Sequence, residues 1–259
     1  MSTAENTGDD EDLAEGTLLS HLIELRSRML RIALAVIGVF IVLIPWADEI
    51  FSAISKPLRE VLPGGQMIAT QVASPLLTPF KLTFFVALFL AMPVVLYQIW
   101  AFVAPGLYRK EKRFAMPLLA SSIVLFYLGI AFAYFVVFPL MFGFFTRVAP
   151  EGVEVQTDIS QFLDFITTIF FAFGMAFEVP IATVLVVWTG LTSPKKLGSA
   201  RPYVFLGSFV VGMFLTPPDM ISQTLLAIPI YLLFELGIIM SRIFSIRDEE
   251  PEEESDSAD

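Results

Sequence analysis

The sequence predicts an all-α membrane protein with six transmembrane helices, and three observations carry that prediction. The 259-residue chain is 56% hydrophobic and only 16% charged, whereas soluble domains are usually about half apolar and about a quarter charged. Its apolar residues gather in stretches long enough to cross a bilayer, which takes about 20 residues. Basic residues gather in alternate connections between those stretches, as in chains that cross a membrane repeatedly.

The spans differ in length, and the fifth is the shortest. They are expected at residues 29–47, 82–104, 114–140, 162–190, 203–216 and 222–241. At about 1.5 Å per residue, the fifth reaches only about 21 Å into a hydrocarbon core about 30 Å thick. Such a short span thins the bilayer or lies at a recessed face of the protein. Pro217 and Pro218 predict a tight turn after it, and Pro180 predicts a kink in the fourth span.

Charge in the connections predicts the orientation. The amino-terminal flank, the second and fourth connections and the carboxyl end together hold 12 Lys and Arg residues, and the opposite side holds four. The basic side of a membrane protein faces the cytoplasm, so both termini are expected there. The connections at 48–81 and 141–161 then face outward, and residues 48–61 can form a short surface helix.

Both ends of the chain are acidic. Residues 1–17 and 246–259 are expected to be disordered acidic tails, because six acids lie among residues 1–15 and eight among residues 248–259. Residues 18–245 are expected to form the membrane domain, with an amphipathic segment before the first span. The acidic start differs from a cleavable signal peptide, so the first apolar stretch is predicted to be a permanent span.

Several classes of chemistry find no support. The chain has no cysteine and one histidine, which excludes disulfides and thiolate metal sites. It contains no P-loop, dinucleotide fingerprint, zinc motif or nucleophile elbow. No enzyme activity, cofactor, metal or nucleic-acid partner is therefore expected.

Two acids lie within predicted spans. Glu178 precedes Pro180 in the fourth span, where an ionisable group costs about 2.5–3.5 kcal/mol and is a functional candidate. It is read as a polar site inside a cavity, with a structural carboxyl bonded to a neighbouring helix as the alternative. Glu235 lies two turns from Arg242 on one helix face, and an interfacial ion pair between them is the favoured interpretation.

Two further acids belong to the basic, cytoplasmic side. The residues before the first span repeat apolar side chains at helical spacing, and Glu24 can pair with Arg28 one turn later. Glu111 lies among four basic residues, and simple charge neutralisation is one interpretation. The other is that Glu24 and Glu111 together grip guanidinium groups through paired hydrogen bonds, which favours Arg over Lys.

Polar residues also flank the fifth-to-sixth turn. Thr216 and Gln223 lie close to the lipid phase. They can bond across to another helix at about 0.5–2 kcal/mol each, or they can be hydrated at a thinned interface. The two interpretations are equally supported at this point.

Taken together, these residues resemble the TatC family, the core subunits of twin-arginine protein translocases. The resemblance runs from about residue 18 to residue 242. Its motifs are His21-Leu22-Ile23-Glu24-Leu25-Arg26, Ala73-Ser74-Pro75 with Thr78-Pro79-Phe80-Lys81, the stretch at residues 97–108, Phe177-Glu178-Val179-Pro180 and Thr216-Pro217-Pro218-Asp219.

The resemblance implies a concave, glove-like bundle with short fifth and sixth helices in the bacterial cytoplasmic (inner) membrane. It implies a receptor for the twin-arginine signal peptides of folded cargo proteins, which are transported by the proton-motive force. The positions that match the family's signal-peptide site are Glu24, Glu111, Phe102, Leu107 and Tyr108. Glu178 matches an intramembrane glutamate of the family.

The resemblance also implies partners. Met213, Thr216 and Gln223 match the site where single-span TatA- and TatB-like subunits dock, and self-association in a multimeric complex within the lipid is expected. Three alternatives remain from the residues alone: a proton-coupled small-solute transporter that uses Glu178, a membrane-embedded enzyme, and a passive scaffold. The absence of matching broken helices in the two halves counts against the transporter.

Overall fold

The chain is folded as a bundle of helices. The computed structural model describes residues 6–61, 67–103, 112–148, 157–215 and 220–249. In these ranges the only extended pairing is a single bridge between Ile68 and Asp158, which confirms the all-α prediction. Four described helical stretches are long and apolar enough to cross a membrane, a bent pair of helices can make a fifth span, and a shorter apolar helix accompanies them.

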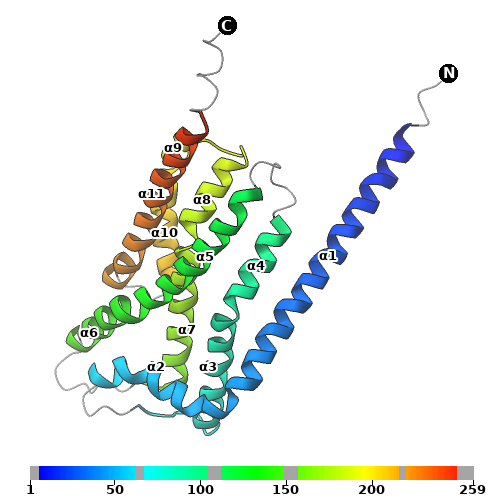
Figure 1. The fold of residues 1–259 in the computed structure, drawn as a ribbon. Helices are drawn as coiled ribbons and strands as arrows, with labels where there is room; N and C mark the ends of the chain where they lie inside the picture. The colour runs from blue at the N-terminus through cyan, green and yellow to red at the C-terminus, as the bar shows by residue number, and fades with distance from the viewer. Residues whose placement is uncertain (1–5, 62–66, 104–111, 149–156, 216–219, 250–259) are drawn as a thin grey trace.

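The first span is one long helix at the side of the bundle. Helix α1, Asn6–Leu43, runs into a 3₁₀ turn at Ile44–Trp46 and then into α2, Ala47–Val61. Acids near a helix amino terminus are favourable to its dipole, which fits a start at Asn6, before the amphipathic segment expected from residue 18. The helix expected at 48–61 is confirmed as α2, which crosses the end of the bundle opposite the start of α1 (Figure 1).

The second span is broken in the middle. Helices α3, Ser74–Leu90, and α4, Met92–Val103, meet at Ala91 with a bend of 48°. The break follows from Pro93, which has no N–H for the carbonyl of Phe89. The hydroxyl of Tyr127 donates a hydrogen bond to that carbonyl instead, at 3.1 Å. The span was expected from residue 82 and begins earlier, because the prolines and polar residues of 74–81 hide the helix from an apolar pattern.

The third and fourth spans also contain interruptions. Helix α5, Lys112–Phe132, continues through a π-helical turn at Ala133–Val137 into α6, Phe138–Val148. The fourth consists of α7, Ile159–Ala176, and α8, Val179–Trp188, with Phe177 and Glu178 at the break. The helix is therefore interrupted just before Pro180, where the sequence predicts a kink.

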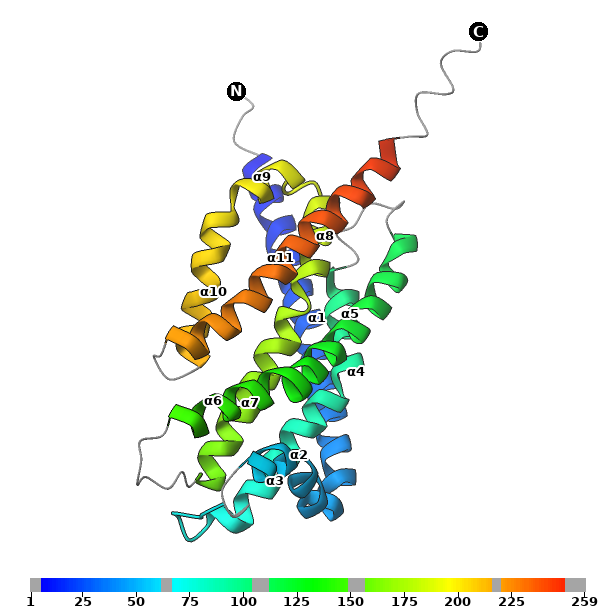
Figure 2. The same ribbon diagram turned by 90° about the vertical axis from the view of Figure 1, so that its left-hand side faces the viewer.

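The last helices form a hairpin that covers only part of the bundle. Helix α9, Pro194–Ser199, leads into α10, Arg201–Leu215, which packs along α11, Met220–Glu249. The short fifth helix is confirmed. The sixth is longer than expected because it continues past its apolar span at Gln223–Ile243 into the acidic carboxyl end. The hairpin stops well short of α2, and the start of α1 and the end of α11 lie at the opposite end (Figure 2).

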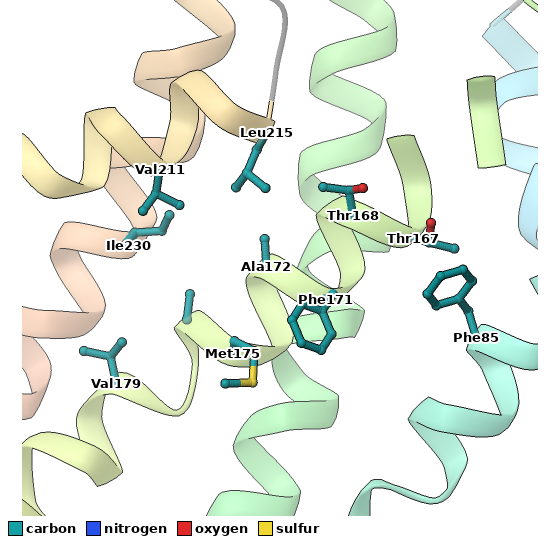
Figure 3. A pocket seen from close by; sticks show the side chains of 11 residues that line it. Phe85, Thr167, Thr168, Phe171, Ala172, Met175, Val179, Val211, Leu215 and Ile230 are labelled. Carbon is teal, nitrogen blue, oxygen red and sulfur yellow. The ribbon is translucent and has the colours of Figure 1, made fainter. Parts of the chain in front are cut away.

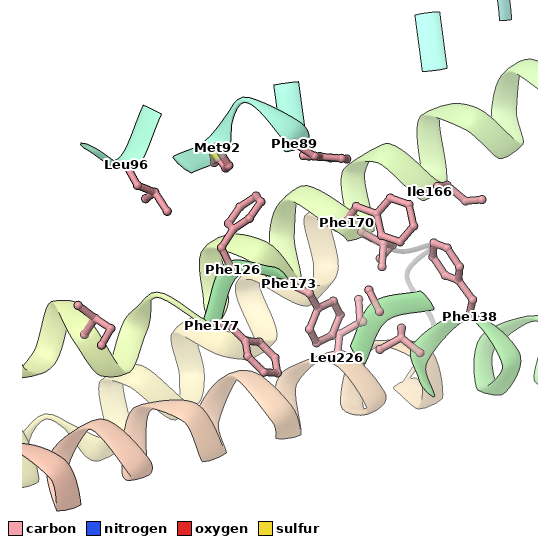
Figure 4. Packing of buried hydrophobic residues seen from close by; sticks show 14 of the residues in the cluster. Phe89, Met92, Leu96, Phe126, Phe138, Ile166, Phe170, Phe173, Phe177 and Leu226 are labelled. Carbon is pink, nitrogen blue, oxygen red and sulfur yellow. The ribbon is translucent and has the colours of Figure 1, made fainter. Parts of the chain in front are cut away.

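Phenylalanine is the most frequent residue of the core. The rings of Phe126, Phe138, Phe170 and Phe173 are buried where α3, α5, α6 and α7 meet (Figure 4). The ring centroids of Phe138 and Phe170 are 5.1 Å apart, within the range at which aromatic pairs attract each other. This aromatic packing fixes the frame that holds the broken spans.

Glycines allow α5 and α7 to approach closely. A Cβ atom on Gly129 would lie 2.4 Å from the carbonyl oxygen of Phe173, and one on Gly174 would lie 2.5 Å from the ring of Phe126. Small residues at helix contacts are typical of membrane proteins, where packing rather than water exclusion holds helices together. These two positions therefore set the distance between α5 and α7.

A polar clamp joins two connections at the α2 end. Asp158 caps α7 by accepting hydrogen bonds from the backbone N–H groups of Ser160 and Gln161, at 2.8 and 3.2 Å. Its other oxygen accepts from the hydroxyl and the backbone N–H of Thr70, at 2.7 and 2.8 Å. These bonds, led by that from the Thr70 hydroxyl, lower the pKa of Asp158 to about 2. The carboxylate thus ties the segment before α3 to the start of α7.

We predict that Gly129→Ala destabilises the protein by about 1–3 kcal/mol, because the added methyl group cannot fit against the α7 backbone. Thermal unfolding in detergent measures the effect. Gly207→Ala is the matched control, since a Cβ atom there meets nothing within 4 Å. Equal midpoints for the two variants would contradict the close packing of α5 and α7.

We also predict an acid-sensitive clamp. Because the folded pKa of Asp158 is about 2, below its ordinary value of 3.8, the clamp contributes stability above about pH 4 and loses it as the pH falls toward 2. Asp158→Asn should lower the unfolding midpoint at neutral pH and flatten its decline in acid. Asp164→Asn, which removes only an exposed ion pair with Lys81, should leave the acid decline in place. An unchanged decline in Asp158→Asn would refute the assignment.

Candidate functional site

The Glu24 carboxylate already holds a guanidinium group. Its Oε1 atom accepts hydrogen bonds from Nε and Nη2 of Arg28, at 3.0 and 2.5 Å. The predicted pairing one turn apart on α1 is therefore confirmed. The Glu24 side chain remains 39% exposed, whereas Arg28 is 17% exposed, so the acid is open to a ligand and the base is mostly covered.

Arg28 also reaches across to α4. Its Nη1 atom donates to Oε1 of Gln98 at 3.1 Å, and Nη2 donates to the carbonyl of Ala101 at 3.1 Å. Gln98 is buried. A carboxylate, an amide oxygen and a carbonyl oxygen thus surround the planar guanidinium group of Arg28. This arrangement of acceptors matches the donor geometry of arginine better than that of lysine.

Only part of the predicted signal-peptide site falls within the described residues. Phe102 lies in the last turn of α4, one turn beyond Gln98. Glu111, Leu107 and Tyr108 lie outside the described residues, so their relation to Glu24 stays a prediction.

Glu178 lies at the break between α7 and α8 and points into the bundle. Its Oε2 atom accepts a hydrogen bond of 2.6 Å from the hydroxyl of Ser122 on α5. Ser122 is in turn 3.4 Å from Nε1 of Trp100 on α4. Oε1 of Glu178 is buried without a hydrogen-bond partner among the described residues. The alternative interpretation, a structural carboxyl bonded to a neighbouring helix, therefore accounts for Oε2 of Glu178 but not for the burial of Oε1.

The prediction for Glu235 is wrong in its partner. Arg201, at the start of α10, donates to both carboxylate oxygens of Glu235 at 2.7 and 2.8 Å, and the hydroxyl of Tyr231 donates to Oε1 at 2.8 Å. Arg242 is exposed. The packing of α10 along α11 brings a closer guanidinium from 34 residues away, which spacing on a single helix could not indicate.

Two of the three residues expected to dock partner subunits, Met213 and Gln223, lie on the α10–α11 hairpin. Met213 is 48% exposed. Gln223 does bond across to another helix, because its Nε2 atom donates to the carbonyl of Phe209 at 2.7 Å. Gly212 allows this approach, since a Cβ atom there would lie 3.2 Å from Gln223. Thr216 lies outside the described residues.

An apolar groove of about 530 Å³ opens between α7 and this hairpin. In Figure 3, Val211 and Leu215 of α10 and Ile230 of α11 face Ala172 and Met175 of α7 across it. Thr167 and Thr168 also line it, but both hydroxyls bond to carbonyls of their own helix. The groove therefore presents an apolar surface of the kind that an apolar helix or a lipid chain covers.

Known proteins resemble the chain closely. The family model for the Sec-independent protein translocase protein TatC matches residues 20–229. The chain is 59% identical to the TatC protein of Azotobacter chroococcum mcd 1 over 241 residues, which cover 93% of each protein. It is 58% identical to that of Escherichia coli K12 over 228 residues, or 88% of each.

The chain belongs to the TatC family. A crystal structure of the twin arginine translocase receptor TatC agrees with its fold at a TM-score of 0.78 and 33% identity, and covers 87% of this chain and 99% of that one. A second structure of that receptor, in DDM, gives a TM-score of 0.77. The chain is thus a multi-pass membrane protein of a Sec-independent protein translocase, not an enzyme.

The family match includes Glu24, Glu178 and Gln223 and ends before Glu235. Sequence reasoning did not single out Gln98, Trp100 or Ser122 as site residues. The sequence signal for these residues is weak. Gln98 and Ser122 are polar residues within apolar spans, but the sequence does not show which residues they contact. Within the described residues, no group of three or more His, Asp or Glu side chains could hold a metal ion.

Proposed function

We propose that this TatC-family protein is the receptor that recognises the twin-arginine motif of signal peptides on folded cargo proteins. The arrangement around Glu24 carries the proposal. The Glu24 carboxylate on α1 is 39% exposed and already binds the Arg28 side chain. Two oxygen atoms of α4 accept the remaining hydrogen bonds of that guanidinium group. The description of the similar crystal structures as a twin arginine translocase receptor supports it.

Glu24 and Glu111 are proposed to bind the two guanidinium groups, with Phe102, Leu107 and Tyr108 beside them. Paired hydrogen bonds between a carboxylate and the guanidinium fork favour Arg over Lys. The apolar part of the signal peptide then inserts along the bundle toward Glu178. The buried oxygen of Glu178 that lacks a donor is a suitable polar end point for that path.

Transport is proposed to require TatA- and TatB-like single-span partners and the proton-motive force. The partners dock at Met213, Thr216 and Gln223, beside the short hairpin. The apolar groove along α10 supports this assignment, because it offers an apolar helix a surface next to a polar contact. Self-association of this chain in a multimeric complex belongs to the same proposal.

The protein is proposed to lie in the bacterial cytoplasmic membrane with both termini in the cytoplasm. The excess of basic residues on one set of connections supports that orientation. The position of the start of α1 and the end of α11 at one end of the bundle agrees with it.

A proton-coupled small-solute transporter that uses Glu178 is the second candidate. The unpaired buried oxygen of Glu178 favours it, and the absence of an internal repeat opposes it. The transporter predicts solute uptake by this chain alone in liposomes, whereas the receptor predicts none.

We predict that a twin-arginine signal peptide crosslinks to the purified chain in nanodiscs near Glu24 and Glu111. The peptide carries a photoreactive probe beside the Arg pair, and mass spectrometry locates the label. A Lys-Lys peptide should not label this region, because an ammonium group lacks the planar fork. Glu111→Lys should abolish labelling without unfolding the bundle.

Glu24→Gln should also reduce labelling, and Glu60→Gln is its matched control. Glu60 likewise pairs with a base one turn away on its helix, Lys56, but lies on α2 at the opposite end of the bundle. Equal labelling by both peptides, or normal binding by folded Glu111→Lys, would show that these carboxylates are structural. The liposome uptake assay would then be the next test.

We predict that Gln223→Ala reduces co-purification of a TatA- or TatB-like partner by roughly 3-fold or more, from loss of a polar contact worth about 0.5–2 kcal/mol. Thr224→Ala is the control from the next position, because its hydroxyl bonds to Met220 on its own helix. Quantified pull-down from detergent extracts gives the comparison. Equal recovery by both variants would remove Gln223 from the docking site.

A further inference from the structure

A line of contacts that runs through helix α4 connects Glu24 with Glu178, with hydrogen bonds at each end and the helix itself between them. At one end, Arg28 bonds to Glu24 and to α4 through Gln98 and the carbonyl of Ala101. At the other end, Glu178 accepts from Ser122, which lies against Trp100 of the same helix α4. The packing order agrees, because α1 packs on α4, α4 on α5, and α5 on α8.

Helix α4 is the element that both ends share. Gln98, Trp100 and Ala101 fall within a single helical turn. Arg28 holds this turn from the α1 side, and Ser122 meets it from the α5 side. A shift of the turn relative to α1 therefore changes the contact with Ser122.

The Ser122 side of this line is enclosed. Ser122 is 1% exposed and Trp100 is 7% exposed, so water does not replace their contacts. Ser122 Oγ donates its single proton to Glu178 and accepts from the indole N–H. Loss of the indole contact would leave the position of that hydroxyl, and hence of the Glu178 carboxylate, less restrained.

We propose that Trp100 and Ser122 are positioning residues that couple occupancy of the Glu24 site to the carboxylate of Glu178. The inference rests on the proposed receptor function and adds a means of regulation to it. A bidentate grip on an incoming arginine needs both oxygens of Glu24, and Arg28 bonds to one of them. The incoming guanidinium competes with Arg28 for the Glu24 carboxylate. Displaced Arg28 then weakens its hydrogen bonds to Gln98 and Ala101 of α4, and the turn that carries Trp100 moves against Ser122.

The experiment uses the full chain in nanodiscs and reads Trp100 directly. The chain has three tryptophans, so Trp46→Phe with Trp188→Phe leaves Trp100 as the sole tryptophan, which is excited selectively over tyrosine. The twin-arginine peptide should shift the emission of Trp100, and the Lys-Lys peptide should not. In this background Ser122→Ala should remove the shift while peptide binding, measured by crosslinking, is retained.

Ser121→Ala is the matched control, because the Ser121 hydroxyl bonds to the carbonyl of Pro117 on its own helix. It should keep the emission shift. In cells, Ser122→Ala and Trp100→Phe should lower transport of a twin-arginine cargo by roughly 5-fold or more, the lower end of usual coupling between sites, with binding unchanged.

The outcomes separate the two proposals. Peptide that binds with no change in Trp100 emission, or a shift that survives Ser122→Ala, would overturn the coupling and leave the receptor standing. If Ser122→Ala and Trp100→Phe transported cargo as well as Ser121→Ala does, the coupling would likewise be overturned and the receptor function would stand. Failure of the twin-arginine peptide to bind would overturn the receptor function and the coupling with it.

Discussion

Backbone groups inside a bilayer have no water to bond with, so each must find a partner within the protein. Pro93, Pro139 and Pro180 each remove one donor from a span of this chain, and the fold is arranged around those losses. Tyr127 supplies a hydroxyl at the first break, a π-helical turn precedes Pro139, and Glu178 lies at the third break. The breaks are therefore where side chains of different spans meet, and the polar line through the bundle begins at one of them.

The frame and the surfaces of the bundle are built differently. The fourth span has 56% of its apolar window buried, against 6% for the first, because phenylalanine rings and the Gly129 contact fasten α7 to α5. Helix α1 packs on α3 and α4, with Phe40 against Phe84, but most of its large apolar side chains stay exposed. The lightly packed first span and the short α10–α11 hairpin leave apolar surface for lipid or partner helices, while the α5–α7 unit stays fixed. Elements that move or bind ligands come from the less stable parts of a structure, so this division suits the proposed docking of partner subunits.

Periodic and local features of the chain were predictable, and contacts between distant segments were not. The apolar spans, the α2 helix and the pairing of Glu24 with Arg28 follow from spacing along one helix. The break before Pro180 follows from a missing donor, and the break at Pro93 has the same cause but no prediction from the sequence. Glu235 was given Arg242 because sequence shows only its own helix, whereas Arg201 comes from α10. Family resemblance identified candidate positions, but the bonds that Arg28 and Ser122 make to other helices appear only in three dimensions.

The internal arginine also bears on how a receptor of this kind could release its ligand. Arg28 makes hydrogen bonds to a carboxylate, an amide and a backbone carbonyl, and each would otherwise be left partly buried without a donor. An incoming guanidinium that displaces Arg28 from Glu24 replaces the hydrogen bonds to that carboxylate, so the net free energy of exchange is small compared with the strength of the individual bonds. Lysine has no planar fork with which to make the same exchange. Discrimination between Arg and Lys can then be strong while binding stays reversible, which suits the proposed receptor for signal peptides.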